Sequence, residues 1–183
     1  MAKLTTNAKA YFVEAARSVF EVDQDVAEVI AEIIHEEFDN LNDKLKEFEE
    51  EIEESKPVDA LAELYSLVVD HLNDLTLNEN GGYTGSLYEL EQGNTSYQFC
   101  TLDEMEEEAH GQFDSLIDEM LHEAEWVKNH VVPSWERGQT RKEFVEEGVR
   151  IDGPAHFVSH YDGDYTEVKT SSSGVYYSYW RNN

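Results

Sequence analysis

The apolar and polar positions between Asp25 and Ser55 predict one long helix with two opposite faces. Apolar residues recur every three or four positions, as on one face of an α-helix. Acidic residues recur at the same spacing but two positions out of step, which places them about 200° away around the helix. The pattern predicts a buried apolar side and a solvent-facing row of carboxylates, formed by Glu28, Glu32, Glu36, Asp39, Asp43, Glu47, Glu50 and Glu54.

Two further helices are predicted beside this acidic helix. A first helix covers about 5–20, and either Asp23 or Asp25 caps the acidic helix that follows. Pro57 ends the acidic helix and opens another, which runs to about residue 75. That helix is apolar around most of its circumference, which is typical of a helix in the centre of a protein.

A second long acidic helix is predicted over 103–131. Asp103 is its expected cap and Pro133 its expected end, and apolar residues again recur every three or four positions. A short helix is expected afterwards around 140–147. The acidic positions selected on the long helix are Glu104, Glu107, Asp114, Asp118 and Glu125.

Alternating patterns predict the β-structure. Residues 83–91 and 95–102 read as a hairpin around Gly93, and three C-terminal strands are expected at 155–161, 165–170 and 175–181. The predicted fold is α+β: a bundle of about four helices, two of them long and acidic, with an inserted β-hairpin and a small C-terminal antiparallel sheet. Two parts are expected in one domain, an acidic helical body at 1–132 with hairpin 83–102, and a near-neutral, Tyr-rich β part at 133–183.

Charge is the strongest compositional signal. The net charge is −28, and residues 1–127 hold 33 acids and 6 bases, whereas residues 128–183 hold 8 acids and 7 bases. Such a surface repels nucleic acid and anionic lipid, and it attracts basic partners over long range. We therefore expect no direct binding to nucleic acid or to a membrane surface.

Hydropathy and cysteine content indicate where the protein works. No apolar run reaches the ~18–20 residues of a membrane span, and the N-terminus lacks the apolar segment of a secretory signal. Cys100 is the single cysteine, which excludes an internal disulfide and fits a reducing compartment. We therefore expect a protein of the cytoplasm.

Few residues suggest catalysis or metal binding. No serine nucleophile motif or phosphate-binding glycine loop is present, so we expect neither an enzyme nor a bound cofactor. Glu-x-x-His pairs of the kind that hold metals in helical bundles keep a metal-binding bundle open as an alternative, although so many glutamates produce such pairs by chance. These pairs are Glu32 with His35, Glu107 with His110, and Glu119 with His122.

The two acidic helices approach the charge density of DNA. Residues 25–55 carry 13 acids and 2 bases, and residues 103–131 carry 10 acids and 1 base. Side by side they would present one charge per ~2.2 Å, against ~1.7 Å for duplex DNA. Like charges one helical turn apart cost a few tenths of a kcal/mol each, a cost that solubility alone does not require.

In charge density, paired acidic helices and small size, the chain resembles the DNA-mimic proteins that phages and mobile elements use against host restriction, CRISPR or nuclease systems. The resemblance implies a stoichiometric, non-catalytic inhibitor whose carboxylates occupy the Lys/Arg-rich groove of a DNA-binding protein. It also implies that the inhibitor works in the cytoplasm of a bacterial host cell. The Tyr-rich C-terminal part would supply either a homodimer contact or a partner-specific contact. An acidic adaptor or chaperone of basic proteins is the other alternative.

Overall fold

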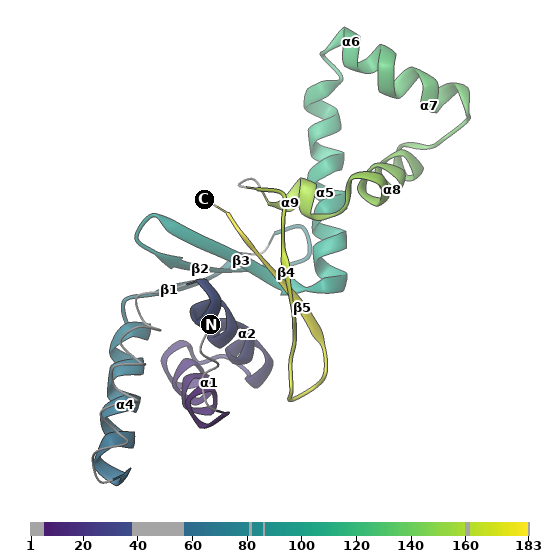
Figure 1. The fold of residues 1–183 in the computed structure, drawn as a ribbon. Coiled ribbons are helices and arrows are strands. Elements are labelled where there is room, and N and C mark those ends of the chain that lie inside the picture. Colours follow the sequence, from purple (N-terminus) through teal and green to yellow (C-terminus); the bar gives the residue numbers. More distant parts are fainter. Residues whose placement is uncertain (1–5, 38–56, 81, 86, 160–161, 183) are drawn as a thin grey trace. The chain divides into compact units, whose positions relative to one another are not determined.

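The computed structural model describes residues 6–37, 57–80, 82–85, 87–159 and 162–182. The predicted α+β class is confirmed. The predicted second half of the first acidic helix lies outside the described residues. The helices are α1 (Thr6–Phe20), α2 (Gln24–Glu37), α4 (Pro57–Leu72), α5 (Leu102–Met120), α6 (Ala124–Trp126), the π-helix η1 (Val127–Val131), α7 (Val132–Glu136), α8 (Arg141–Asp152) and α9 (Ala155–Val158) (Figure 1).

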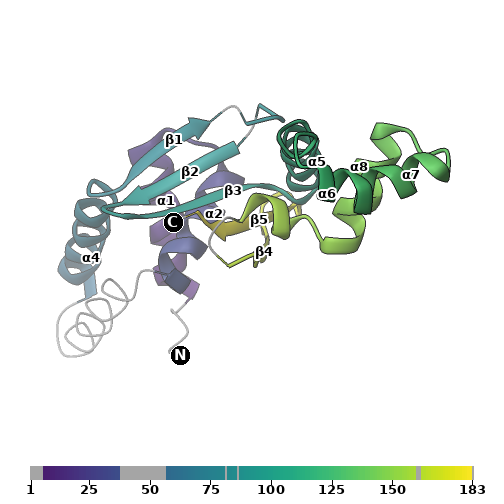
Figure 2. The ribbon, with the colours of Figure 1, turned by 90° about the horizontal axis from the view of Figure 1, so that it is seen from above.

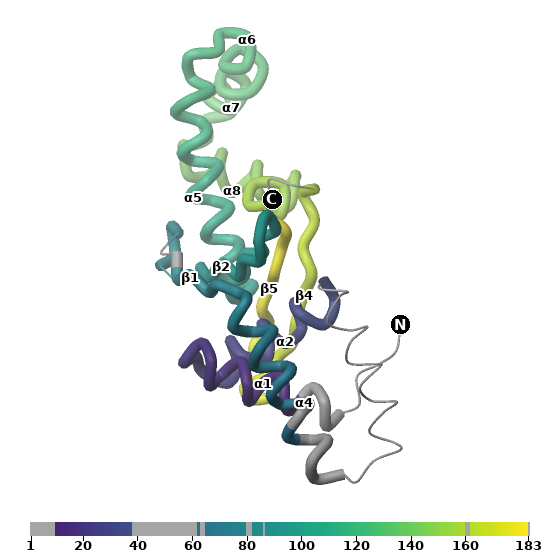
Figure 3. Tube along the Cα trace, turned by 90° about the vertical axis from the view of Figure 1, so that its left-hand side faces the viewer, coloured from purple at the N-terminus to yellow at the C-terminus, as the bar shows by residue number. Residues whose placement is uncertain are grey.

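One antiparallel sheet contains all five strands of the described chain, in the order β1-β2-β3-β5-β4. Figure 2 shows β1, β2 and β3 alongside one another, and β4 lies beside β5 in both Figures 1 and 3. The predicted hairpin and the C-terminal strands therefore share a single sheet, and a four-helix bundle is not confirmed. The strands are β1 (Thr76–Asn80), β2 (Leu87–Gln92), β3 (Thr95–Thr101), β4 (Thr166–Lys169) and β5 (Tyr176–Arg181).

The predicted β2–β3 hairpin is confirmed. Gly93 lies between the two strands with a φ of 62°, a left-handed conformation that glycine adopts without strain. The Tyr88 ring stacks on the Phe99 ring across the hairpin, with 5.2 Å between centroids. This cross-strand pair places both residues on the same side of the sheet.

The chain divides into two compact units, each built from separate stretches of sequence. Unit 1 contains residues 1–78, 90–94 and 168–177, and unit 2 contains 79–89, 95–167 and 178–183.

In unit 1, α1 packs against both α2 and α4. The apolar face predicted for α2 is confirmed, since Ile30, Ile33 and Ile34 are at most 1% exposed. Asp23 caps this helix by accepting a hydrogen bond from the Val26 N–H at 2.9 Å.

In unit 2, α5 packs against β3, α8 and α9. The buried cluster that joins them includes Met105 and Phe113 of α5, Val149 of α8 and Trp180 of β5. Figure 1 shows α5 as the longest helix of this unit, with α8 and α9 beside it. None of the helices in the described part of the chain combines the length and the apolar surface needed to cross a bilayer.

Three local predictions are wrong. Residues 155–158 form helix α9 instead of a strand, because Pro154 starts a helical turn whose short apolar run carries no periodic signal. The second acidic helix stops at Met120 and restarts at Ala124, since Glu123 is extended. Pro133 lies in the first turn of α7, where no N–H is needed, so it does not end a helix.

Candidate functional site

Glu28 lies inside unit 1, although the sequence predicted a solvent-facing carboxylate. It is 8% exposed, and its Oε2 accepts hydrogen bonds from the backbone N–H and the hydroxyl of Ser171, at 2.5 and 2.9 Å. Ser171 belongs to the turn between β4 and β5, which is part of the same unit. The prediction that Glu28 faces solvent is wrong because this turn supplies donors to its carboxylate.

Serines of the same turn also donate hydrogen bonds to the Asp25 carboxylate. The hydroxyl of Ser172 donates to Asp25 Oδ1, and the hydroxyl of Ser173 donates to Oδ2 at 2.6 Å. Burial acts to raise the pKa of both the Asp25 and Glu28 carboxyls, but the hydrogen bonds from these serines outweigh it and lower both pKa values. These two carboxylates therefore stabilise unit 1 in their charged form.

The other predicted acids on α2 are more exposed to solvent than Glu28. Glu32 is half-buried, and Glu36 is exposed with its Oε1 3.8 Å from His35 Nε2. The rest of the predicted row lies outside the described residues, namely Asp39, Asp43, Glu47, Glu50 and Glu54.

Helix α5 carries the densest described row of acids, with eight Asp or Glu and no Lys or Arg among its 19 residues. Its start is fixed by a capping box in which Glu104 Oε2 accepts from the Thr101 N–H at 2.9 Å. The Glu104 N–H in turn donates to Thr101 Oγ1. Thr101, and not the predicted Asp103, is therefore the cap, and the Glu104 carboxylate is directed at the helix start instead of at solvent.

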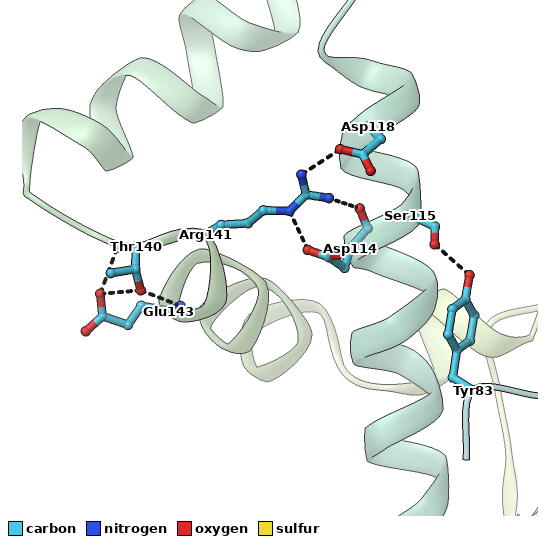
Figure 4. Close-up of polar contacts among 7 residues, drawn as sticks. All are labelled: Tyr83, Asp114, Ser115, Asp118, Thr140, Arg141 and Glu143. Carbon is cyan, nitrogen blue, oxygen red and sulfur yellow. Dashed lines mark hydrogen bonds and ion pairs between the residues drawn. The ribbon is translucent and has the colours of Figure 1, made fainter. Parts of the chain in front are cut away.

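Asp114 and Asp118 are exposed but share one cation. Arg141 Nε lies 2.5 Å from Asp114 Oδ1, and its Nη1 lies 2.5 Å from Asp118 Oδ1 (Figure 4). The hydrogen bond from Arg141 lowers the pKa of Asp118. Of the other predicted residues, Glu107 on α5 and Glu125 on α6 are both exposed.

A buried carboxylate on α5 is not among the residues predicted from the sequence. Glu108 is 2% exposed, and its Oε2 accepts a hydrogen bond from the Tyr83 N–H at 2.6 Å. The Tyr83 ring packs on Gly111, where a Cβ atom would lie 2.4 Å from Tyr83 Cγ. A glycine inside a helical pattern was the available signal of this close approach.

Metal-ligand clusters and the single cysteine are the other groups with possible chemistry. The described residues contain no group of three or more His, Cys, Asp or Glu side chains placed to hold a metal ion. Cys100 is buried, and burial raises the pKa of its thiol, with the Glu104 and Glu108 carboxylates adding to the effect. The thiol is therefore protonated and inaccessible.

The aromatic C-terminal strand belongs mostly to the core. Tyr177, Tyr179 and Trp180 are 9%, 3% and 1% exposed, whereas Tyr176 is 45% exposed. Three of the four aromatic residues therefore cannot act as exposed contacts for a partner. No family model, curated protein or solved structure matches the chain.

Proposed function

We propose that this protein is an acidic DNA mimic that occupies the DNA-binding groove of a host defence protein, in a restriction, CRISPR, nuclease or helicase system. Binding is stoichiometric and involves no chemical step. The observation that carries the proposal is α5, where eight acids and no Lys or Arg occupy 19 residues.

The geometry of α5 supports the proposal in two ways. The helix is about 28 Å long at 1.5 Å per residue, and six of its acids are exposed: Asp103, Glu106, Glu107, Asp114, Asp118 and Glu119. Packing against β3, α8 and α9 holds the helix in place. Fixed carboxylates lose little entropy on binding and attract a basic groove over long range.

The proposed contact residues are the exposed or half-buried members of the predicted set, apart from those with a structural role. Glu28 and Glu104 are excluded because hydrogen bonds hold their carboxylates inside the fold or at a helix start. Those that remain lie on α2 in unit 1 and on α5 and α6 in unit 2. The contact residues retained from the described chain are Glu32, Glu36, Glu107, Asp114, Asp118 and Glu125.

The test is displacement of DNA from a captured partner. Proteins that bind the immobilised chain from a bacterial lysate are purified, and each is loaded with a fluorescent DNA duplex. We expect the chain to displace the duplex at one molecule per site, and less effectively as salt increases. A partner that binds duplex and chain together contradicts the mimic and supports the alternative, an acidic adaptor of basic proteins.

A pair of matched variants tests the surface. Glu107→Lys with Glu125→Lys reverses two proposed contacts, and Glu136→Lys with Asp152→Lys makes the same change in net charge at exposed positions on α7 and α8. We expect the first pair to weaken displacement about tenfold, because like charges now face the groove, and the control pair to weaken it much less. Equal weakening of displacement by both pairs would show that net charge alone determines displacement, and it would contradict the assigned contact surface.

A further inference from the structure

Unit 2 contains a pocket of about 490 Å³ beside the acidic face of α5. Its walls come from Tyr83, from one face of α5, and from α9. This volume falls in the range of about 300–1,000 Å³ that is usual for ligand sites. The contacts proposed for the mimicry of DNA do not involve this pocket.

Tyr83 forms a fixed wall of the pocket. Its N–H donates to Glu108 Oε2, and its ring lies against Gly111. Its hydroxyl lies 2.6 Å from Ser115 Oγ, as Figure 4 shows. These contacts fall on one face of α5 and hold the ring along the helix. Tyr83 is nevertheless 54% exposed, so a positioned aromatic surface remains accessible.

The polar groups of the pocket favour a donor-rich cation. Glu119 supplies an exposed carboxylate. The Gln112 Nε2 donates to Glu108 Oε1, which leaves the Gln112 side-chain oxygen to accept a hydrogen bond from a ligand. Leu116, 43% exposed, adds an apolar surface. None of the described side chains that line the pocket is Lys or Arg, and besides Tyr83 its described ionisable groups are the Glu119 carboxylate and the His156 imidazole.

We propose that this pocket receives an arginine side chain of the partner protein. A guanidinium is planar and weakly hydrated, so it stacks on an aromatic ring and donates to a carboxylate at the same time. Tyr83 offers the ring, Glu119 the carboxylate, and Leu116 a surface for the methylene groups. Lysine fits less well because its ammonium is a compact, strongly hydrated charge.

The inference rests on the proposed function, since a groove that binds DNA is rich in Lys and Arg. It adds a specific anchor to a surface that otherwise acts through its overall charge. Such an anchor fixes the register of the partner, which a row of exposed carboxylates does not do by itself.

The test is an NMR titration of the full ¹⁵N-labelled chain with Nα-acetylarginine amide. We expect saturable shifts at Tyr83, Gln112 and Ser115, with weaker binding of the lysine analogue and none of the neutral citrulline analogue. Glu119→Gln should weaken arginine binding about tenfold, because a hydrogen bond between charged groups is lost. Glu136→Gln removes an exposed carboxylate from α7 and should change nothing.

Shifts that spread over many acidic residues without saturating, or that are equal in Glu119→Gln and the unchanged chain, would overturn the assignment. Failure of the pocket is distinguishable from failure of the mimic. If the unchanged chain displaces DNA but arginine binding does not localise to the pocket, only the anchor is wrong. If it binds arginine in the pocket but fails to displace DNA from captured partners, the mimic is wrong.

Discussion

Arg141 of α8 connects Asp114 and Asp118, which lie one turn apart on α5 (Figure 4). In addition to the two carboxylate contacts, its Nη2 donates to the Asp114 backbone carbonyl at 2.6 Å. One cation therefore serves two members of the proposed contact row. The arginine ties α8 to α5, but it also removes part of the negative charge that the proposed function needs.

Replacing Arg141 should release that charge. In Arg141→Gln, we expect the pKa of Asp118 to rise toward its ordinary value of 3.8, because the hydrogen bond that lowers it is lost. Carboxyl ¹³C NMR titration measures this shift. We also expect association with a captured partner to be a few-fold faster at low salt, since one positive charge is gone. Arg150→Gln makes the same charge change at an exposed position on α8 and should leave Asp118 unaffected.

The contact between Glu28 and Ser171 predicts a loss of stability in acid. Because the pKa of the folded-state Glu28 carboxyl lies below its ordinary value of 4.5, its contribution is complete above about pH 4.5 and disappears as the pH falls further. The pKa of the folded-state Asp25 carboxyl also lies below its ordinary value of 3.8, so its contribution to stability is likewise lost as the pH falls. Urea unfolding followed at a series of pH values measures this dependence.

Glu28→Gln isolates the contribution of this carboxylate. We expect it to lower the free energy of unfolding by about 1–3 kcal/mol at pH 7, because a buried charged acceptor is replaced by a neutral one. The pH dependence below pH 4.5 should become shallower. Glu36→Gln on the same helix, at an exposed position, is the control. An unchanged acid transition in Glu28→Gln would contradict the assignment.

Local patterns were sufficient for several elements of the fold. The caps, apolar spacing and Gly93 turn that predict α1, the first half of the acidic helix and the β2–β3 hairpin all act over a few residues. Strand β1 was missed because its sequence, Thr76–Asn80, is polar and contains two asparagines, which are uncommon in strands. Its pairing with β2 was the information that the sequence pattern lacked.

The candidate site was less predictable because its details depend on distant contacts. Periodicity assigns Glu28 to the polar face of α2, but Ser171, 143 residues away, encloses it. Likewise, Arg141 is 27 residues from Asp114, so no helical spacing reveals their pairing. A pattern predicts which face of a helix is acidic, and it does not predict which part of the chain will cover that face.

The cap of α5 gives a further prediction. Thr101→Ala should lower the free energy of unfolding by about 1 kcal/mol, because its hydroxyl no longer accepts the Glu104 N–H. Thr101→Ser retains the hydroxyl and should be close to neutral. Thermal unfolding followed by circular dichroism compares the two variants. Equal loss in both would mean that the methyl group of Thr101, and not the cap, provides the stabilisation.

The contact between Gly148 and Phe113 tests the packing of α8 on α5. An alanine in the middle of a helix normally stabilises it by about 1 kcal/mol relative to glycine. Here the added Cβ atom would lie 2.3 Å from Phe113 Cε1, in the core of unit 2. We therefore expect Gly148→Ala to destabilise the protein by about 1–3 kcal/mol, the usual cost of overpacking.

Phe113→Leu shortens the side chain that meets the new methyl group, so it separates the clash from other effects of Gly148→Ala. Alone, it should destabilise the protein by about 1 kcal/mol, because it leaves space in the core. The double variant should lose about 1 kcal/mol less than the sum of the two single variants, since each change relieves the cost of the other. Strictly additive losses, measured by urea unfolding, would show that Gly148 and Phe113 are not in contact.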